Sequence, residues 1–200
     1  MYTLINGSPK PINSNSLYFL KIISKKIDNF KIFELKKNKY NEIIESIEKS
    51  DVIVFALPLY VDSPTSITLS FFDYIIDNNI NLNNKKIYIV INCGFREGEQ
   101  NITAVNIIKN WCLKVGGIYS GSIMIGAGEI VGKTKYKFIS FTALKKLTSF
   151  SNSIKLKQKS KDFIITMNLL NNKMYCYLAN LSWTKKGRLN NLSKQDLIIK

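Results

Sequence analysis

The chain has 200 residues, of which 46% are apolar, and 29 Lys and Arg against 14 Asp and Glu give it a formal net charge of +15. This length and apolar content suit one domain with an appendage and argue against wholesale disorder. The absence of histidine excludes Ser-His-Asp and Cys-His hydrolases and His-ligated metals. The three cysteines lie far apart with no CxxC, so no zinc site or cysteine-ligated iron–sulfur cluster is predicted. An enzyme with this composition must rely on a cofactor, or on carboxylates, lysines or tyrosines.

No apolar run approaches the roughly 18 residues of a membrane-spanning helix, and the first strand begins at once, with no secretory signal. We therefore expect a soluble, cytoplasmic protein without membrane insertion. The charge is uneven, because residues 1–132 hold 14 Lys and Arg against 12 Asp and Glu, whereas residues 133–200 hold 15 against 2. A basic segment of this kind suits an anionic partner or is a solvated lysine-rich face. We favour the solvated face, since the whole chain is rich in Lys, Asn and Ile, and we expect no specific nucleic-acid binding.

The beginning of the chain has the pattern of a strand, a polar loop and a helix. Tyr2 to Ile5 is a short apolar run, residues 6–16 are rich in Asn, Ser, Pro and Lys, and from Leu17 apolar residues recur at helical spacing. Such a unit forms an anion site in an open α/β sheet, because the helix N-terminus offers N–H groups and the positive end of its dipole. A phosphate would fit in this loop, although an ordinary capped turn explains the same residues.

Strands and helices alternate through the first 150 residues. Further strands are predicted at residues 30–35, 51–57, 86–92 and 118–125, and helices at residues 42–49, 65–78, 102–115 and 136–150. Ser63 and Pro64 suit an N-cap and a first-turn proline, and Gly116 and Gly117 suit a helix C-cap. This alternation predicts an α/β fold with a doubly wound, five-stranded parallel sheet.

After residue 150 the pattern changes. A polar, basic linking segment, an apolar run and an amphipathic helix follow at residues 151–161, 163–170 and 175–188. Ser193 then suits the cap of a last short helix, with Asp196 three residues on. We therefore divide the chain into a domain at residues 1–150 and a basic, mostly helical C-terminal extension at residues 151–200.

Ligands of a doubly wound sheet bind at the carboxyl ends of its strands, so the candidate site lies in the loops at residues 6–16, 58–64, 92–101 and 126–134. Prolines bracket the second loop, which offers Tyr60 beside aliphatic side chains and backbone amides. That combination suits a flat heteroaromatic ring, or a rigid turn whose tyrosine covers the core. In the third loop, Gly94 permits close backbone approach and Phe95 offers a second apolar surface. Cys93 is assigned to packing, because no base is near it in the sequence.

Three segments, GSPKPINSNS, ALPLYVDSPTS and NCGFRE, follow the first, third and fourth predicted strands. Together they resemble the flavodoxin-like NAD(P)H-dependent FMN reductase family over residues 1–130, and their order at the right strand ends makes the match fairly specific. The segment YLANLSWTKKGRLNNLSKQDL resembles the C-terminal extension of one bacterial branch. The resemblance implies a flavodoxin-like sheet of order 2-1-3-4-5, FMN as cofactor, NADH or NADPH as co-substrate, and a homodimer.

In that family the first loop holds the FMN phosphate, and the second and third surround the isoalloxazine ring. Carried over, the residues that hold the phosphate are Ser8, Lys10, Ser14, Asn15 and Ser16. The residues that surround the ring are Pro58, Leu59, Tyr60, Val61, Asp62, Asn92, Cys93, Gly94 and Phe95. No side chain is assigned as a catalytic acid or base, and no metal ligand is predicted. Arg96 departs from the family, in which we expect proline at this position, and its charge could meet the nicotinamide nucleotide or alter the ring contacts.

The resemblance implies an oxidoreductase that passes a hydride from NAD(P)H to the flavin and on to a small-molecule acceptor such as a quinone, a nitro compound or free flavin. The alternative is a non-enzymatic FMN-bound electron carrier, or an interaction module that uses the basic tail. A dinucleotide Rossmann site is unsupported, because no GxGxxG follows the first strand. A phosphorylatable receiver needs acidic residues where this chain has Asn6 and Gly7. Flavodoxin carriers look acidic and use a Thr-rich phosphate loop, unlike this basic chain.

Overall fold

The computed structural model describes residues 1–10, 12–131, 137–168, 171–193 and 195–197. It divides into two compact units, Met1–Thr166 and Met167–Lys200, and each is described by itself. The first unit extends past residue 150, where the sequence suggested a boundary. Tyr136, predicted to begin a helix, residues 132–134 of the fourth loop, and Leu169 and Leu170 lie outside the described residues.

The first unit is built on a parallel sheet with the order β2-β1-β3-β4-β5-β6. Its strands are β1 Tyr2–Asn6, β2 Phe30–Glu34, β3 Val52–Pro58, β4 Lys86–Asn92, β5 Ile118–Ile125 and β6 Phe163–Ile165. The predicted fold class and the order 2-1-3-4-5 are confirmed, and β6 is an addition at the edge beside β5. Every residue from Val52 to Leu57 is buried, as expected of a central strand that is covered on both faces.

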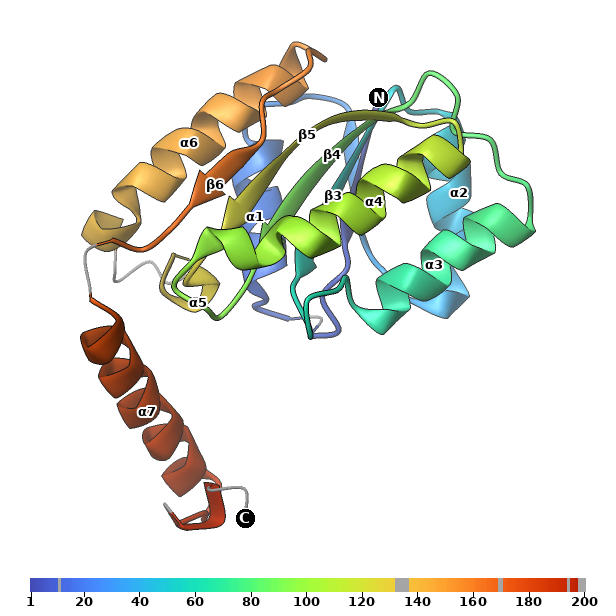
Figure 1. Cartoon of the computed structure of the whole chain (residues 1–200). Coiled ribbons are helices and arrows are strands. Elements are labelled where there is room, and N and C mark those ends of the chain that lie inside the picture. Colours follow the sequence, from blue (N-terminus) through green and yellow to red (C-terminus); the bar gives the residue numbers. More distant parts are fainter. Residues whose placement is uncertain (11, 132–136, 169–170, 194, 198–200) are drawn as a thin grey trace. The chain divides into compact units, whose positions relative to one another are not determined.

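Helices cover both faces of this sheet (Figure 1). They are α1 Asn15–Ser24, α2 Tyr40–Glu48, α3 Ser66–Asp77, α4 Ile102–Lys114, the short α5 Gly128–Val131, and α6 Lys137–Lys155, with 3-10 turns η1 Lys37–Lys39 and η2 Gly98–Asn101. The helices α2, α3 and α4 share one apolar core with one face of the sheet, and α1 and α6 lie on the other face. Thr65 is the N-cap of α3, so the predicted cap at Ser63 is wrong by two residues.

Aromatic packing holds the α3–α4 side of the sheet together. Phe72 on α3 stacks on Trp111 on α4 with ring centroids 4.0 Å apart, and Phe55 on β3 meets both rings edge-on at 5.5 and 5.9 Å. Pairs of this geometry add roughly 0.5–1.5 kcal/mol each to the free energy gained by burying their surface. The sheet edge that carries the candidate loops therefore rests on a rigid base.

The segment predicted to be a linker, residues 151–161, is instead part of the first unit. Its first residues continue α6, where Ile154 is fully buried and the Ser151 hydroxyl donates to the Leu147 carbonyl at 2.7 Å. Asp162 then anchors the start of β6, because it accepts from Lys109 Nζ at 2.8 Å and from the Ser122 amide at 2.9 Å. The linker prediction was wrong because many small and charged side chains of this segment face solvent and hide its buried stripe.

The second unit contains α7 Asn172–Leu189 and the 3-10 turn η4 Gln195–Leu197. Asn171 caps α7 by accepting from the Met174 amide at 2.9 Å. The predicted cap of the last turn is confirmed, because the Ser193 hydroxyl donates to Asp196 at 2.6 Å and the Asp196 amide returns a hydrogen bond at 3.4 Å. Among the described residues, no helix is long and apolar enough to cross a membrane.

Candidate functional site

Four loops leave the sheet at its carboxyl edge, where the register brings the strand ends together. Asn6 at the end of β1 pairs with Ala56, Pro58 at the end of β3 pairs with Asn92, and Asn92 at the end of β4 pairs with Ile125. The loops after β1, β3, β4 and β5 therefore start side by side, as the sequence predicted for a doubly wound sheet.

The first loop joins β1 to α1 and is fixed from below. Ser14 caps α1 by accepting from the Leu17 backbone N–H at 3.1 Å, and the side-chain Nδ2 of Asn6 donates to the same hydroxyl at 3.3 Å. A Cβ at Gly7 would lie 2.3 Å from Leu57 Cδ2 and 2.7 Å from Thr68 Oγ1, so any other residue would displace these buried side chains. The N-terminus of α1, with its first-turn backbone N–H groups and positive dipole end, therefore lies at the carboxyl edge.

The second loop contains a tight turn in a strained conformation. Tyr60 and Ser63 exchange backbone hydrogen bonds of 3.0 and 3.1 Å, and between them Val61 and Asp62 have φ values of 48° and 56°. Two successive positive φ values are those of a type I′ turn, which favours Asn and Gly and disfavours a β-branched residue. Val61 is 97% exposed, so packing does not explain the strain. Strain at such positions accumulates at ligand sites.

The third loop presents an open backbone beside an aromatic ring. A Cβ on Gly94 would meet no atom within 4 Å, and the neighbouring Phe95 ring is 57% exposed. On the second loop, Tyr60 is 52% exposed, whereas Leu59 is buried. The edge therefore offers two aromatic side chains and a stretch of approachable backbone, as a planar ligand requires.

The fourth loop clamps the third by backbone contacts. The Ala127 amide donates to the Phe95 carbonyl at 2.6 Å, and the Gly128 amide donates to the Cys93 carbonyl at 2.8 Å. A Cβ on Gly126 would lie 2.2 Å from the Arg96 carbonyl oxygen, so only glycine fits. Backbone contacts consequently hold the third loop at Cys93, Phe95 and Arg96.

The residues predicted from the sequence divide by their burial. Those exposed or half-buried at the edge are Ser8, Lys10, Asn15, Pro58, Tyr60, Val61, Asp62, Gly94 and Phe95. Those buried beneath them are Ser14, Ser16, Leu59, Asn92 and Cys93. Asn92 on β4 links β3 to α1, because its side-chain Nδ2 donates to the Leu57 carbonyl at 2.9 Å and to the Ser16 hydroxyl at 3.4 Å. The structure thus gathers all these residues around one edge and gives the buried ones contacts that support the loops.

Cys93 lies under the third loop in a packing position. Burial raises the pKa of its thiol, which approaches the carbonyls of Phe95 and Glu97. A buried thiol with a raised pKa is a poor nucleophile. Within the part of the chain that the structure describes, no group of three His, Cys, Asp or Glu side chains could hold a metal ion.

Two threonines at the N-terminus of α3 were not predicted from the sequence to belong to the site. The Thr65 hydroxyl donates to the Gly7 carbonyl at 2.9 Å and lies 2.8 Å from the Thr68 hydroxyl, and both residues are buried. They connect the first loop to the second. The only signal in the sequence is two threonines three residues apart after Pro64, a pattern that also suits an ordinary helix cap.

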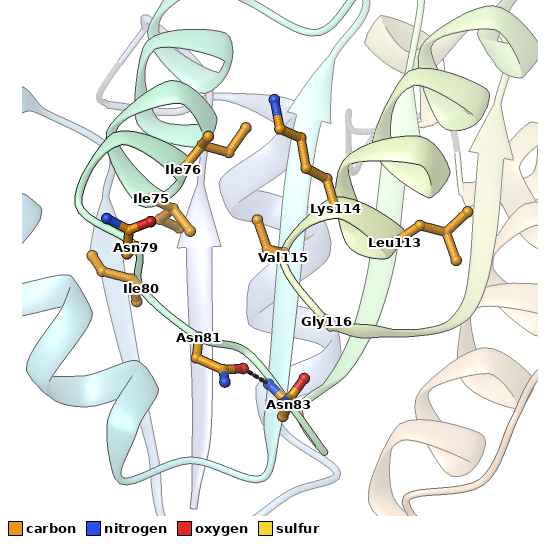
Figure 2. Close-up of a pocket in the computed structure, with 10 residues that line it drawn as sticks. All are labelled: Ile75, Ile76, Asn79, Ile80, Asn81, Asn83, Leu113, Lys114, Val115 and Gly116. Atoms are coloured by element: carbon orange, nitrogen blue, oxygen red, sulfur yellow. Dashed lines mark hydrogen bonds between the residues drawn. The ribbon is translucent and has the colours of Figure 1, made fainter.

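A pocket of about 530 Å³ lies elsewhere, between the ends of α3 and α4 (Figure 2). Asn83 and Gly116, which line it, precede β4 and β5, so it opens at the amino edge of the sheet. Its lining mixes isoleucines with asparagines, and Asn81 accepts a hydrogen bond from the Asn83 amide at 2.8 Å. This pocket is separate from the four loops.

A search with protein-family models matches residues 3–122 to NADPH-dependent FMN reductase. The chain belongs to this family. The match runs from within β1 to within β5 and includes the first three loops. FMN is therefore the cofactor and NAD(P)H the co-substrate, and the chain is a flavin-dependent NAD(P)H oxidoreductase. No curated protein matches the chain.

Solved structures confirm the fold of this FMN reductase family member. The Trp repressor binding protein from Bacillus subtilis is 17% identical, with a TM-score of 0.60 over 74% of this chain and 97% of that chain. An NADPH-quinone reductase from P. pentosaceus is 14% identical, with a TM-score of 0.60 over 78% and 97%. A flavodoxin from Streptococcus pneumonia is 14% identical, with a TM-score of 0.57 over 78% and 98%. These identities support the shared fold alone.

The donor set of the edge fits FMN. The first loop offers the α1 N-terminus, the half-buried Ser8 and the exposed Lys10, which suit a phosphate. The second and third loops offer Tyr60, Phe95 and the open backbone at Gly94, which suit a planar ring. The spacing also agrees, because β1 and β4 are two strand spacings apart, about 10 Å, and a flavin and its ribityl chain can span that distance.

Proposed function

We propose that the chain passes a hydride from NAD(P)H to FMN bound at the carboxyl edge, and then reduces a small-molecule acceptor such as a quinone, a nitro compound or free flavin. The observation that carries the proposal is that three loops meet at one edge of the sheet. The first suits a phosphate, the second has a strained turn beside Tyr60, and the third has open space around Gly94. FMN supplies the hydride chemistry when it is bound. The protein binds and orients the flavin and shields it from water.

Each loop has its own task in this proposal. Ser8, Lys10 and Asn15, with the amides of the α1 N-terminus, hold the phosphate, while Ser14 and Ser16 shape the loop from beneath. The remaining predicted residues surround the ring, with Tyr60 and Phe95 as its apolar contacts. No side chain is assigned as an acid or a base, because hydride transfer from NAD(P)H requires none from the protein.

The rigidity of the third loop explains how the site keeps its shape. Backbone hydrogen bonds from Ala127 and Gly128 fix the loop before a ligand arrives, so little conformational entropy is lost on binding. The Tyr60 and Phe95 rings are both more than half exposed, which suits the approach of a second planar molecule. This arrangement suits a reaction in which nucleotide and acceptor use the same exposed space in turn.

Anaerobic reduction tests the proposal and separates it from the electron-carrier alternative. The FMN-loaded chain is mixed with NADH and, separately, with NADPH, and its absorbance near 450 nm is followed. We expect rapid bleaching with at least one nucleotide and recovery of the colour when a quinone is added. A chain that holds FMN but stays oxidised until a separate reductase is supplied would be a carrier and would contradict the proposal.

The proposal extends to a homodimer, which the family resemblance implies, and to a cytoplasmic location, which the sequence pattern predicts. Light scattering of the FMN-loaded chain at several concentrations tests the first, and the expected mass is twice that of the 22.9 kDa chain. A constant monomer mass would contradict it. Fractionation of the source cells tests the second. We expect the protein in the cytosol, and its recovery with membranes would contradict a cytoplasmic location.

A further inference from the structure

Arg96 places a fixed positive charge on the candidate edge, next to the exposed Phe95. Its Nε and Nη2 both donate to Oε1 of Glu97, at 2.9 and 2.8 Å, and its side chain is only 21% exposed. An arginine held in this way has already lost most of its rotamer freedom, so it can bind an anion at a low entropic cost.

The backbone on both sides of Arg96 is fixed as well. Its carbonyl packs against Gly126, where no Cβ fits, and the Gly98 amide donates to the Thr166 hydroxyl at 3.1 Å. The third loop is thereby tied to the ends of β5 and β6. The Arg96 backbone therefore lies on the β5 side of the third loop, whereas the α1 N-terminus follows β1, two strands away from β4.

The described residues of the four loops include two cationic side chains. Among the described residues of the loops after β1, β3, β4 and β5, the cationic side chains are Lys10 and Arg96. Lys10 follows β1, and the strand order puts the start of its loop about 10 Å from that of Arg96. FMN carries one phosphate, which the first loop would hold. Arg96 is therefore placed for a different anion that comes to the same edge.

We propose that Arg96 binds a phosphate group of the reducing dinucleotide and so positions its nicotinamide beside Phe95. This inference rests on the proposed function, because it assigns a contact to the co-substrate of the same site. The phosphate belongs either to the pyrophosphate, which both dinucleotides have, or to the 2′ position of NADPH. The planar guanidinium suits either group, because it donates paired hydrogen bonds to phosphate oxygens.

Glu97 has a defined part in this assignment. Its carboxylate orients the guanidinium, but its negative charge also opposes the approaching phosphate. Glu97→Gln keeps a carbonyl oxygen for the Arg96 donors and removes the charge. We therefore expect this variant to bind the dinucleotide more tightly than the parent chain, whereas Arg96→Ala binds it more weakly.

The test measures equilibrium binding of NAD⁺ and NADP⁺ to the FMN-loaded chain by calorimetry, together with KM and kcat for NADH and NADPH. Arg96→Ala should weaken dinucleotide binding and raise KM roughly 10- to 100-fold, as expected for the loss of hydrogen bonds to a charged group. Weakening of both dinucleotides assigns Arg96 to the pyrophosphate, and weakening of NADP⁺ alone assigns it to the 2′-phosphate. Arg96→Lys should restore part of the affinity, because it keeps the charge and loses the paired geometry.

The controls separate this inference from the function on which it rests. Lys49→Ala removes an exposed cation that precedes β3 at the opposite edge and should leave dinucleotide binding unchanged. FMN affinity and the thermal midpoint should also stay at parent values in Arg96→Ala, because backbone contacts hold the loop. Unchanged binding of both dinucleotides to a folded, FMN-loaded Arg96→Ala chain would overturn the inference alone. A parent chain that neither nucleotide reduces would overturn the proposed function, and the inference with it.

Discussion

The glycines of the third and fourth loops allow the position of the flavin to be tested without a structure of the complex. Gly94 and Gly126 lie in neighbouring loops, but a side chain would meet different surroundings at each. At Gly94 a Cβ has no atom within 4 Å, and at Gly126 it would lie 2.2 Å from the Arg96 carbonyl oxygen. We therefore expect Gly94→Leu to weaken FMN binding and Gly126→Ala to lower the free energy of unfolding.

The magnitudes follow from these surroundings. Gly94→Leu should change the free energy of unfolding of the FMN-free chain by no more than about 0.5 kcal/mol, as for other open surface positions. If the ring lies over Gly94, the added side chain occupies its space and should weaken FMN binding at least about tenfold, or about 1.4 kcal/mol. Gly126→Ala should lower the free energy of unfolding by about 1–3 kcal/mol, because backbone atoms must move to admit the methyl group.

Two measurements on each variant check this prediction. Urea denaturation of the FMN-free chain gives the free energy of unfolding, and quenching of FMN fluorescence during a titration gives the dissociation constant. Gly94→Ala serves as a graded control, since its single methyl group should weaken FMN less than leucine does. A stable Gly94→Leu chain that binds FMN as tightly as the parent would refute the placement of the ring over the third loop.

Three further substitutions test separate parts of the account. Lys10→Ala should weaken FMN binding roughly 10- to 100-fold while the chain stays folded, and unchanged affinity would mean that Lys10 does not contact the phosphate. Val61→Gly should raise the thermal midpoint of unfolding, because it removes the strain of about 1–2 kcal/mol that a β-branched residue has at φ 48°. A lowered midpoint would argue against strain in this turn. Burial raises the pKa of the Asp162 carboxyl, but hydrogen bonds from Lys109, Tyr119 and Ser122 outweigh it and hold the pKa below its usual range. Asp162→Asn should therefore cost about 1–3 kcal/mol at neutral pH, and the difference from the parent should vanish as the pH falls through the lowered folded-state pKa, whereas a constant difference across pH would contradict this reasoning.

The sheet and the place of its loops were predictable because each rests on a local pattern. The continuous apolar run that ends at Leu57 marks a strand covered on both faces, and the alternation of strands and helices implies a parallel sheet. The carboxyl edge follows from that topology. The cap formed by Ser193 and Asp196 was predictable for the same reason, since a capping box depends only on two residues three positions apart.

The features missed by the sequence analysis depend on contacts between distant segments. Strand β6 has three residues and is defined by its pairing with β5 and by Asp162, which accepts hydrogen bonds from residues of α4 and β5. The strain at Val61 is likewise hidden, because valine argues against the left-handed conformation that the turn imposes. The tie from Thr65 to Gly7 links residues far apart in the chain, and no local pattern distinguishes it from an ordinary cap.

The most direct test of the account is a comparison of FMN with riboflavin, which has the same ring and no phosphate. Each is titrated into the purified 200-residue chain, and binding is followed by quenching of flavin fluorescence. We expect one FMN per chain and riboflavin binding at least about tenfold weaker, because the first loop and the α1 N-terminus bind the phosphate. Equal affinity for the two flavins, or no binding of FMN at all, would contradict the placement of the phosphate in the first loop.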